Sequence, residues 1–152
     1  MNRTLAENIS YGCESVTQNE LLNVLEKTQS IEFLSKLTLG LDSTLSQKND
    51  QISGGEKQRL ALARALLKKA HIIVLDEATS AIDVETEHLI LNELSSTFNN
   101  KTIIIVSHRI STLKNVDRII FIQDQAQVFI GRHDELVASN KSYLNWMKSQ
   151  SM

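Results

Sequence analysis

The stretch from Gln51 to Asp83 constrains the fold more than any other part of the sequence. Its first half, ISGGEKQRLALARALL, predicts a long helix that begins after Ser53. The run from His71 to Leu75 is then continuously apolar in IIVL and is followed by two adjacent acids, Asp76 and Glu77. Such a run is typical of a strand covered on both faces, as in a parallel sheet. We therefore expect a helix, then a buried strand with two carboxylates at its end.

A second strand follows after one helix, and this order sets the fold class. Asp83 is a typical helix cap, and the predicted helix after it has an inner side made of Leu89, Ile90, Leu94 and Phe98. Residues Thr102 to Val106 then form another continuous apolar run. Strand, helix and strand in this order predict a right-handed βαβ unit with parallel strands. The expected class is α/β.

The residues ahead of this unit predict a small helical layer. The segment Thr17-Gln18-Asn19-Glu20 has the T-x-x-E pattern of a capping box and precedes an apolar helical face. A second helix is expected to begin after Ser30 and to end at Gly40. Residues 1–12 have no clear period, and we predict no capped helix there.

The predicted elements become shorter after His108. The patterns predict two strands, at Arg118–Gln123 and Gln127–Ile130, and two helices, near Asp134–Ala138 and Lys141–Lys148. Three large side chains fall at helical spacing in the last of these, namely Tyr143, Trp146 and Met147. We interpret them as packing residues, because buried aromatic side chains are far commoner than cofactor-binding ones.

Composition excludes several functional classes. The 152 residues fit one domain, and 16 basic against 18 acidic side chains give a net charge of −2, which does not favour nucleic acid as a partner. Cys13 is the single cysteine and cannot form an internal disulfide. No apolar run approaches the roughly 20 residues of a membrane helix, and no signal-peptide pattern begins the chain.

The Ser53-Gly54-Gly55-Glu56 turn has two interpretations. It has the S-x-x-E pattern of a capping box, which is a purely structural feature. However, paired glycines are unfavourable in a first helical turn unless the backbone must approach another group closely. A helix N-terminus collects unpaired N–H groups and the positive end of the helix dipole, so this turn also suits a phosphate. Both interpretations can hold together.

Asp76 and Glu77 are the best candidates for nucleotide chemistry. They follow a strand at the sheet edge where open α/β folds bind their ligands, and a cation would relieve the repulsion between two adjacent carboxylates. In phosphoryl transfer one acid typically holds Mg²⁺ and a neighbouring residue positions water. His108 ends the next strand and is expected at the same edge. The other histidines, His71, His88 and His133, are interpreted as surface residues.

Three segments together resemble the nucleotide-binding domain of ATP-binding-cassette (ABC) transporters. ISGGEKQRLALARALL is similar to the signature motif, IIVLDEATSAID to the Walker B strand and D-loop, and IVSHRIS to the H-loop. NRTLAENISYG and GRHDEL resemble flanking segments of exporter-type members. The resemblance covers nearly the whole chain. It implies an incomplete three-layer P-loop NTPase-like fold, with a helical subdomain at about residues 13–52 and the remaining motifs at about residues 53–152.

The resemblance also implies a role for each motif residue. Ser53, Gly54, Gly55 and Glu56 would contact the ATP of a partner domain, although Glu56 stands where the family more often has glutamine. Asp76 would bind Mg²⁺, Glu77 would be the catalytic carboxylate, and His108 would contact the γ-phosphate. Ser80 and Asp83 would lie at the interface of a head-to-tail dimer of nucleotide-binding domains. The other implied partners are membrane domains, at the cytoplasmic face of the cell membrane.

Three features of the family are absent from the sequence, namely the P-loop, the Q-loop glutamine and the aromatic residue that contacts adenine. No segment matches G-x-x-x-x-G-K-[ST], and the chain has five glycines, at positions 12, 40, 54, 55 and 131. Without this P-loop the chain has no backbone cradle and no lysine for the β-phosphate. We therefore expect the C-terminal portion of the motor domain of an exporter, inactive in ATP hydrolysis by itself. The alternatives are a non-catalytic module that donates its signature turn to a partner ATPase, a truncated pseudo-ATPase, and a non-transport ATPase of the same superfamily.

Overall fold

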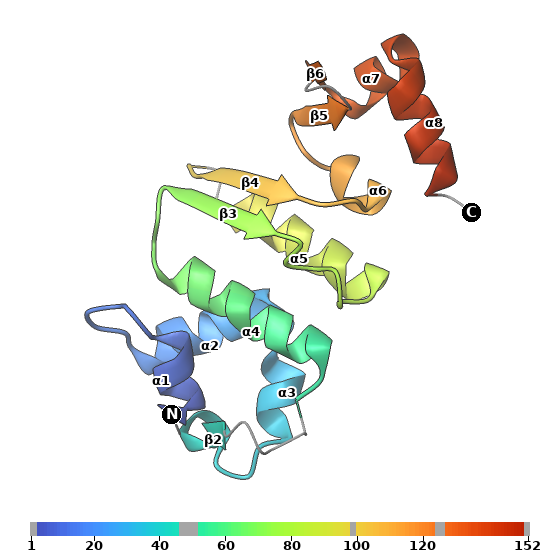
Figure 1. The fold of residues 1–152 in the computed structure, drawn as a ribbon. Helices are drawn as coiled ribbons and strands as arrows, with labels where there is room; N and C mark the ends of the chain where they lie inside the picture. Colours follow the sequence, from blue (N-terminus) through green and yellow to red (C-terminus); the bar gives the residue numbers. More distant parts are fainter. Residues whose placement is uncertain (1–2, 46–51, 98–99, 124–126, 151–152) are drawn as a thin grey trace. The chain divides into compact units, whose positions relative to one another are not determined.

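The computed structural model describes residues 3–45, 52–97, 100–123 and 127–150. The chain divides into two compact units, Met1–Val106 and Ser107–Met152. The first unit holds the elements β1 (Arg3–Thr4), α1 (Leu5–Ile9), α2 (Gln18–Lys27), α3 (Ile31–Ser35), the 3₁₀ helix η1 (Gly40–Asp42), β2 (Thr44–Leu45), α4 (Gly54–Leu67), β3 (Ile72–Asp76), α5 (Val84–Thr97) and β4 (Thr102–Val106) (Figure 1). The second holds α6 (Ile110–Leu113), β5 (Ile119–Gln123), β6 (Gln127–Gly131), α7 (His133–Ser139) and α8 (Lys141–Ser149).

Capping boxes start three helices of the first unit. Thr17 caps α2 and Ser53 caps α4, which confirms both predictions. Thr4 caps α1 in the same way, with reciprocal hydrogen bonds to Glu7 of 2.8 and 3.1 Å. The expectation that residues 1–12 lack a capped helix is therefore wrong, although T-L-A-E has the same T-x-x-E pattern. The second predicted helix also ends earlier than expected. Helix α3 ends at Ser35. Gly40, which has a φ of +52°, is the first residue of η1 and not the C-cap of α3.

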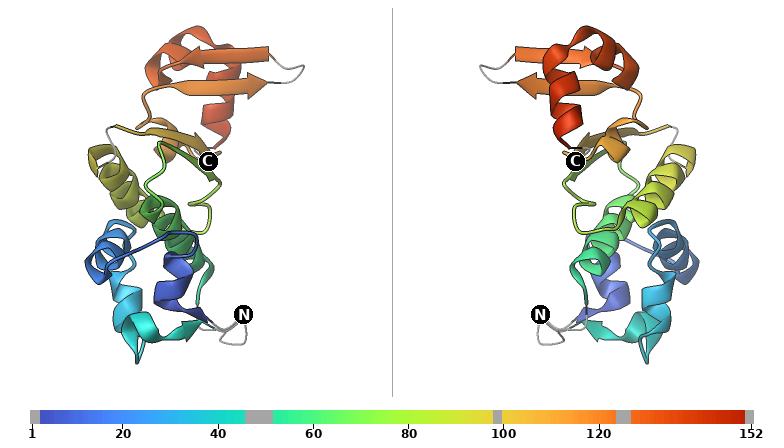
Figure 2. Two further views of the ribbon diagram at one scale, coloured as in Figure 1. Left: turned by 90° about the vertical axis from the view of Figure 1, so that its left-hand side faces the viewer. Right: turned by 90° about the vertical axis from the view of Figure 1, so that its right-hand side faces the viewer.

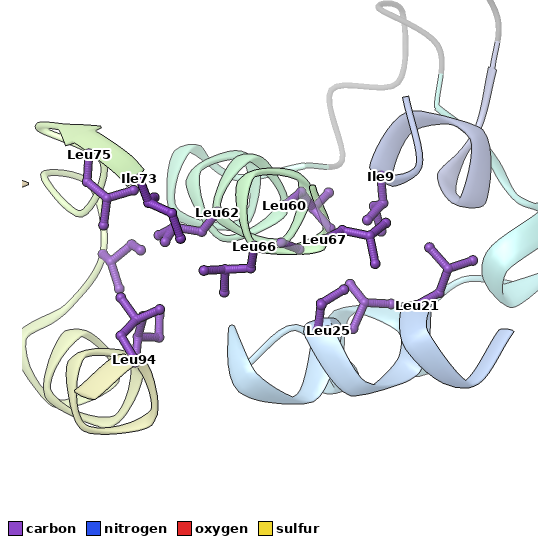
Figure 3. Packing of buried hydrophobic residues seen from close by; sticks show 14 of the residues in the cluster. Ile9, Leu21, Leu25, Leu60, Leu62, Leu66, Leu67, Ile73, Leu75 and Leu94 are labelled. Carbon is purple, nitrogen blue, oxygen red and sulfur yellow. The ribbon is translucent and has the colours of Figure 1, made fainter. Parts of the chain in front are cut away.

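Helix α4 lies at the centre of the first unit and is apolar on two opposite sides. Figure 3 shows Leu60 and Leu67 directed toward α1 and α2, whereas Leu62 lies on the side of β3. All three leucines are buried. The helix therefore joins the helical layer and the strand pair in a single core.

Strands β3 and β4 pair in parallel, as predicted, with Ile72 opposite Thr102 and Asp76 opposite Val106. One face of β3 is buried through Ile73 and Leu75, each about 4% exposed. The other face is open, because Ile72 and Val74 are 60% and 62% exposed. The expectation of a strand covered on both faces is wrong within the described residues. A continuous apolar run indicates that both faces can be covered, but it does not supply the element that covers the second one.

Helix α5 begins at the predicted cap and packs with a slightly different face. The Thr86 N–H donates to Asp83 Oδ1 at 2.9 Å. Ile90, Leu91 and Leu94 are buried, whereas Leu89, predicted on the inner side, is 48% exposed. Phe98, which was also predicted there, lies outside the described residues.

The second unit is an antiparallel hairpin with two helices on one face. Strands β5 and β6 pair with Ile119 opposite Gly131, and Figure 2 shows α7 and α8 on the same side of them. Tyr143 is fully buried and meets the Phe121 ring edge-on at 5.2 Å. Trp146 packs against the same cluster, so the packing interpretation of these two aromatic residues is confirmed. The opposite face of the hairpin exposes four large apolar side chains, Ile120, Ile122, Val128 and Ile130.

His133 departs from its prediction as a surface residue. It is half-buried, and its Nδ1 lies 2.9 Å from the hydroxyl of Tyr143. His71 and His88 are exposed, as expected. Among the residues placed by the structure, no helix has the length and apolar character needed to cross a membrane.

Candidate functional site

The Ser53 turn presents a preformed helix N-terminus to solvent. The Glu56 N–H donates to Ser53 Oγ at 3.2 Å, and the Ser53 N–H donates to the Glu56 carboxylate at 2.8 Å. Partial burial raises the pKa of Glu56, but the hydrogen bonds with Ser53 outweigh this effect and the pKa is lowered overall. The cap uses the Ser53 oxygen as an acceptor, so the hydroxyl hydrogen can still donate to another group. Ser53 and Gly54 are both exposed.

The two glycines of this turn differ in how closely the chain approaches them. A Cβ atom on Gly55 would lie 2.8 Å from the carbonyl oxygen of Ala81, which is closer than real contacts allow. A Cβ atom on Gly54 would lie 3.5 Å from Ala81 Cβ, an ordinary van der Waals distance. Gly55 is therefore required by the close approach of the segment after β3, whereas Gly54 meets no such constraint.

Asp76 and Glu77 lie at the carboxyl end of β3, both exposed. Asp76 belongs to the open face of the strand, as Val74 does. Strict alternation would direct Glu77 toward the buried face, but its backbone adopts a left-handed conformation with φ +45°. The Glu77 N–H still donates to the Val106 carbonyl at 3.0 Å, which extends the pairing with β4 by one residue. The chain thus turns sharply at Glu77 and keeps both carboxylates at the surface.

The segment from Glu77 to Asp83, which we call the D-loop segment, is held from two helices. Gln58 on α4 makes three hydrogen bonds to it, and Thr79 donates to the buried Glu87 of α5 at 2.6 Å. The sequence interpretation did not identify Gln58, Thr79 or Glu87. Only Glu87 carried a signal, because it shares the helical spacing of the buried Ile90 and Leu94.

His108 belongs to the second unit, where it is exposed. Its predicted proximity to Asp76 and Glu77 therefore stays a prediction. The neighbouring Ser107 hydroxyl accepts a hydrogen bond of 3.0 Å from the Arg109 N–H at the start of α6.

The chemistry of the site fits a magnesium ion shared with a nucleotide. Mg²⁺ in such sites is usually bound by one or two carboxylates together with phosphate oxygens and water. Asp76 offers one exposed carboxylate at the strand end, and Glu77 a second beside it. Across residues 3–45, 52–97, 100–123 and 127–150, no group of three or more His, Cys, Asp or Glu side chains is arranged to hold a metal ion by itself.

Comparison with known families identifies the fold. Residues 2–80 match the family described as ABC transporter, a range that includes the Ser53 turn, Asp76 and Glu77. The chain belongs to this family. The signature-like turn and the strand that ends in two acids thus lie within the part of the chain that matches this family.

Curated relatives and a solved structure agree with this assignment. The chain is 39% identical over 143 residues to the ATP-dependent lipid A-core flippase of Vibrio vulnificus (strain YJ016), covering 93% of this chain and 24% of the flippase. It is 39% identical over 138 residues to the β-(1→2)glucan export ATP-binding/permease protein NdvA of Agrobacterium vitis, covering 91% of this chain and 24% of NdvA. A bacterial Atm1-family ABC exporter with ATP bound superposes with a TM-score of 0.90 at 32% identity, covering 100% of this chain and 27% of the exporter chain.

The matches cover only part of each longer protein, so the properties of the whole proteins do not transfer directly to this chain. The chain spans about a quarter of the length of the flippase, of NdvA and of the Atm1-family exporter. The fold assignment, an incomplete α/β P-loop NTPase-like fold, follows directly from the superposition.

Proposed function

We propose that this chain forms the C-terminal portion of the motor domain of an ATP-driven exporter, in which ATP binding and hydrolysis drive transport across a membrane. The observation that carries the proposal is the pair of exposed carboxylates at the end of β3, where Glu77 has a left-handed backbone conformation. Strained backbone conformations of this kind cluster at functional sites. The family of the chain and its similarity to exporters supply the context.

Each motif residue has a role in this proposal. Asp76 would hold Mg²⁺, which would supply positive charge to offset the negative charge of the ATP phosphates. Glu77 accepts a hydrogen bond from the attacking water and orients it, and His108 donates to the γ-phosphate. The Ser53–Glu56 turn, in which Ser53 and Gly54 are exposed, faces the ATP held by a second nucleotide-binding domain. Ser80 and Asp83 lie at the interface with that domain.

The proposed assembly includes more than this chain. Two nucleotide-binding domains pair head to tail, and membrane domains place them at the cytoplasmic face of the cell membrane. Residues of about 13–52 form the helical subdomain in this arrangement, and no role for nucleic acid is proposed. The open face of β3–β4 and the open face of the hairpin both expose isoleucine and valine side chains. Exposed apolar patches of this kind favour the proposal that other protein surfaces cover them in the assembly.

A graft tests the catalytic role directly. We expect the chain, placed in the Vibrio vulnificus flippase instead of its matching segment, to retain ATP hydrolysis. Glu77→Gln in the graft should lower kcat by about a hundredfold or more, as expected for loss of a general base. Glu85→Gln, which changes another exposed glutamate a few residues away, serves as the matched control. Hydrolysis that is unaffected by Glu77→Gln would contradict the assignment.

ATP binding by the chain alone is a separate test. Because the sequence contains no G-x-x-x-x-G-K-[ST] segment, the purified chain should neither bind ATP tightly nor hydrolyse it. Titration with a fluorescent ATP analogue checks this expectation. Binding at micromolar affinity would show that the residues of this chain bind ATP without a P-loop. It would overturn the proposal that this chain supplies only part of each ATP site.

A second candidate function is a non-catalytic module that donates its signature turn to a partner ATPase. The complete capping box at Ser53 favours this alternative, because the turn is formed within the chain without any ligand. In such a module Ser53→Ala should change the ATPase rate of the partner, whereas Glu77→Gln should not. Sensitivity to both substitutions supports the motor domain instead.

A further inference from the structure

One side chain connects the Ser53 turn to the D-loop segment. Gln58 lies on α4 five residues after the cap, and its Nε2 donates to Ser80 Oγ at 2.8 Å and to the Glu77 carbonyl oxygen at 3.3 Å. Its Oε1 accepts from the Ala81 N–H at 2.7 Å. A primary amide has two N–H donors and one carbonyl acceptor, so these bonds use both of its polar atoms.

The bonds hold a surface segment from its inner side. Ser80 and Ala81 are exposed, whereas Gln58 is half-buried beneath them. The Gly55 backbone lies against the Ala81 carbonyl at the same place, so contact between α4 and this segment begins within the first helical turn. A shift of the helix start would therefore be transmitted to Ser80 and Ala81 through a short, fully hydrogen-bonded connection.

We propose that Gln58 is a positioning residue that couples the Ser53 turn to the D-loop segment, so that the two move as one body. Its significance for ATP turnover rests on the function proposed above, in which the Ser53 turn and Glu77 serve two different nucleotides. Gln58 would then transmit the occupancy of one ATP site to the carboxylate of the other. The coupling within the chain does not depend on that function.

Amide hydrogen exchange of the 152-residue chain, followed by NMR, measures the connection at Ala81. Gln58→Met keeps an unbranched side chain of similar size but removes both polar atoms, and we expect it to accelerate exchange at Ala81 about fivefold or more. Gln58→Glu keeps an acceptor oxygen and should leave the Ala81 amide protected. Lys57→Ala, at the adjacent exposed position, should change nothing. Unchanged exchange at Ala81 in a folded Gln58→Met chain would overturn the proposal.

A double-mutant cycle separates coupling from simple stabilisation. Ser53→Ala removes the acceptor for the Glu56 N–H and should accelerate exchange at both Glu56 and Ala81. In the Gln58→Met background it should accelerate Glu56 alone. An equal effect at Ala81 in both backgrounds, or no effect there in either, would show that Gln58 does not transmit the change. No nucleotide or partner is needed, so this result stands apart from the outcome of the ATPase graft.

Discussion

The hydroxyl of Thr79 donates a hydrogen bond of 2.6 Å to the carboxylate of Glu87, and both side chains are buried. This bond joins the D-loop segment to the first turn of α5. A buried carboxylate that loses a donor has no water to replace it, and such a loss typically costs about 1–3 kcal/mol. The pair therefore contributes to both the stability of the first unit and the position of the segment after Glu77.

Thr79→Val should lower the free energy of unfolding by about 1–3 kcal/mol, because it removes the donor and preserves the shape of the side chain. Urea denaturation followed by circular dichroism measures the change. The matched control is Thr102→Val at an exposed strand position, which should alter stability by less than about 0.5 kcal/mol. Equal stability of Thr79→Val and the wild type would mean that the bond is replaced by another.

Alanine substitution should distinguish the two glycines of the Ser53 turn. Gly55→Ala places a Cβ atom 2.8 Å from the Ala81 oxygen and should destabilise the chain by about 1–3 kcal/mol, as overpacking does. Gly54→Ala meets only an ordinary contact and should be neutral or stabilising by up to about 1 kcal/mol. Thermal melting of the two variants side by side is sufficient. The explanation based on close approach fails if both variants lose stability equally.

Glycine at position 77 should stabilise the chain while removing its candidate catalytic group. The left-handed backbone at φ +45° is unfavourable for glutamate and free of strain for glycine. After allowance for the greater freedom of glycine in the unfolded chain, Glu77→Gly should raise the free energy of unfolding by about 0.5–1 kcal/mol. Glu77→Ala is the control, since alanine keeps the strain. A similar gain in both variants would argue against a strained backbone.

Stability should fall in acid partly because of one ion pair between α2 and the end of α4. Lys69 Nζ lies 2.7 Å from Glu20 Oε1, and this hydrogen bond, together with those from Thr17, lowers the pKa of Glu20 from 4.5 to about 2. A depressed pKa in the folded state means that the contribution is fully present above the unfolded value and disappears as pH falls from about 5 to 2. Lys69→Met should flatten the stability profile in this range.

The acid-range measurement needs a control for loss of a positive charge. Lys57→Met removes an exposed lysine from α4, the helix that ends just before Lys69, and should leave the slope of stability against pH unchanged between pH 5 and 2. Chemical denaturation at several pH values gives both profiles. Parallel profiles for the wild type and Lys69→Met would show that the ion pair does not form in solution.

The open face of β3–β4 should promote self-association. Val74 and Ile104 lie opposite each other in the register and are 62% and 48% exposed. Replacing both with threonine should reduce association, measured by light scattering, and change the free energy of unfolding by less than about 1 kcal/mol. Ile73→Thr, on the buried face, should instead destabilise the chain. Unchanged association of the double variant would exclude this face as its cause.

Local signals in the sequence predicted much of the fold. The start of α4, the cap of α5 and the bounds of β4 follow from short patterns whose physical cause lies within a few residues. The Thr4 cap follows the same rule, because Thr4 and Glu7 have the T-x-x-E spacing. Leu89 is exposed although it was predicted on the inner side, because Ile90, Leu91 and Leu94 form the buried face of α5 and an apolar residue beside that face has a similar helical periodicity.

The tertiary contacts of the site could not be predicted from the sequence, because they join residues that are far apart along the chain. The need for glycine at position 55 depends on Ala81, and the role of Gln58 depends on hydrogen bonds to residues more than twenty positions away. Nor does a pattern of residues indicate a left-handed backbone at Glu77. These features arise when α4 packs against β3 and the segment that follows it. They can therefore be identified only from the three-dimensional structure.

The three capping boxes also bear on how the chain is made. Each box closes its hydrogen bonds within four consecutive residues, so α1, α2 and α4 can begin without any strand in place. Synthesis proceeds from the N-terminus at roughly 5–20 residues per second, and α4 precedes both strands of the parallel pair in the chain. We therefore expect a helical layer to form beside the ribosome first, and to offer β3 and β4 an apolar surface as they emerge.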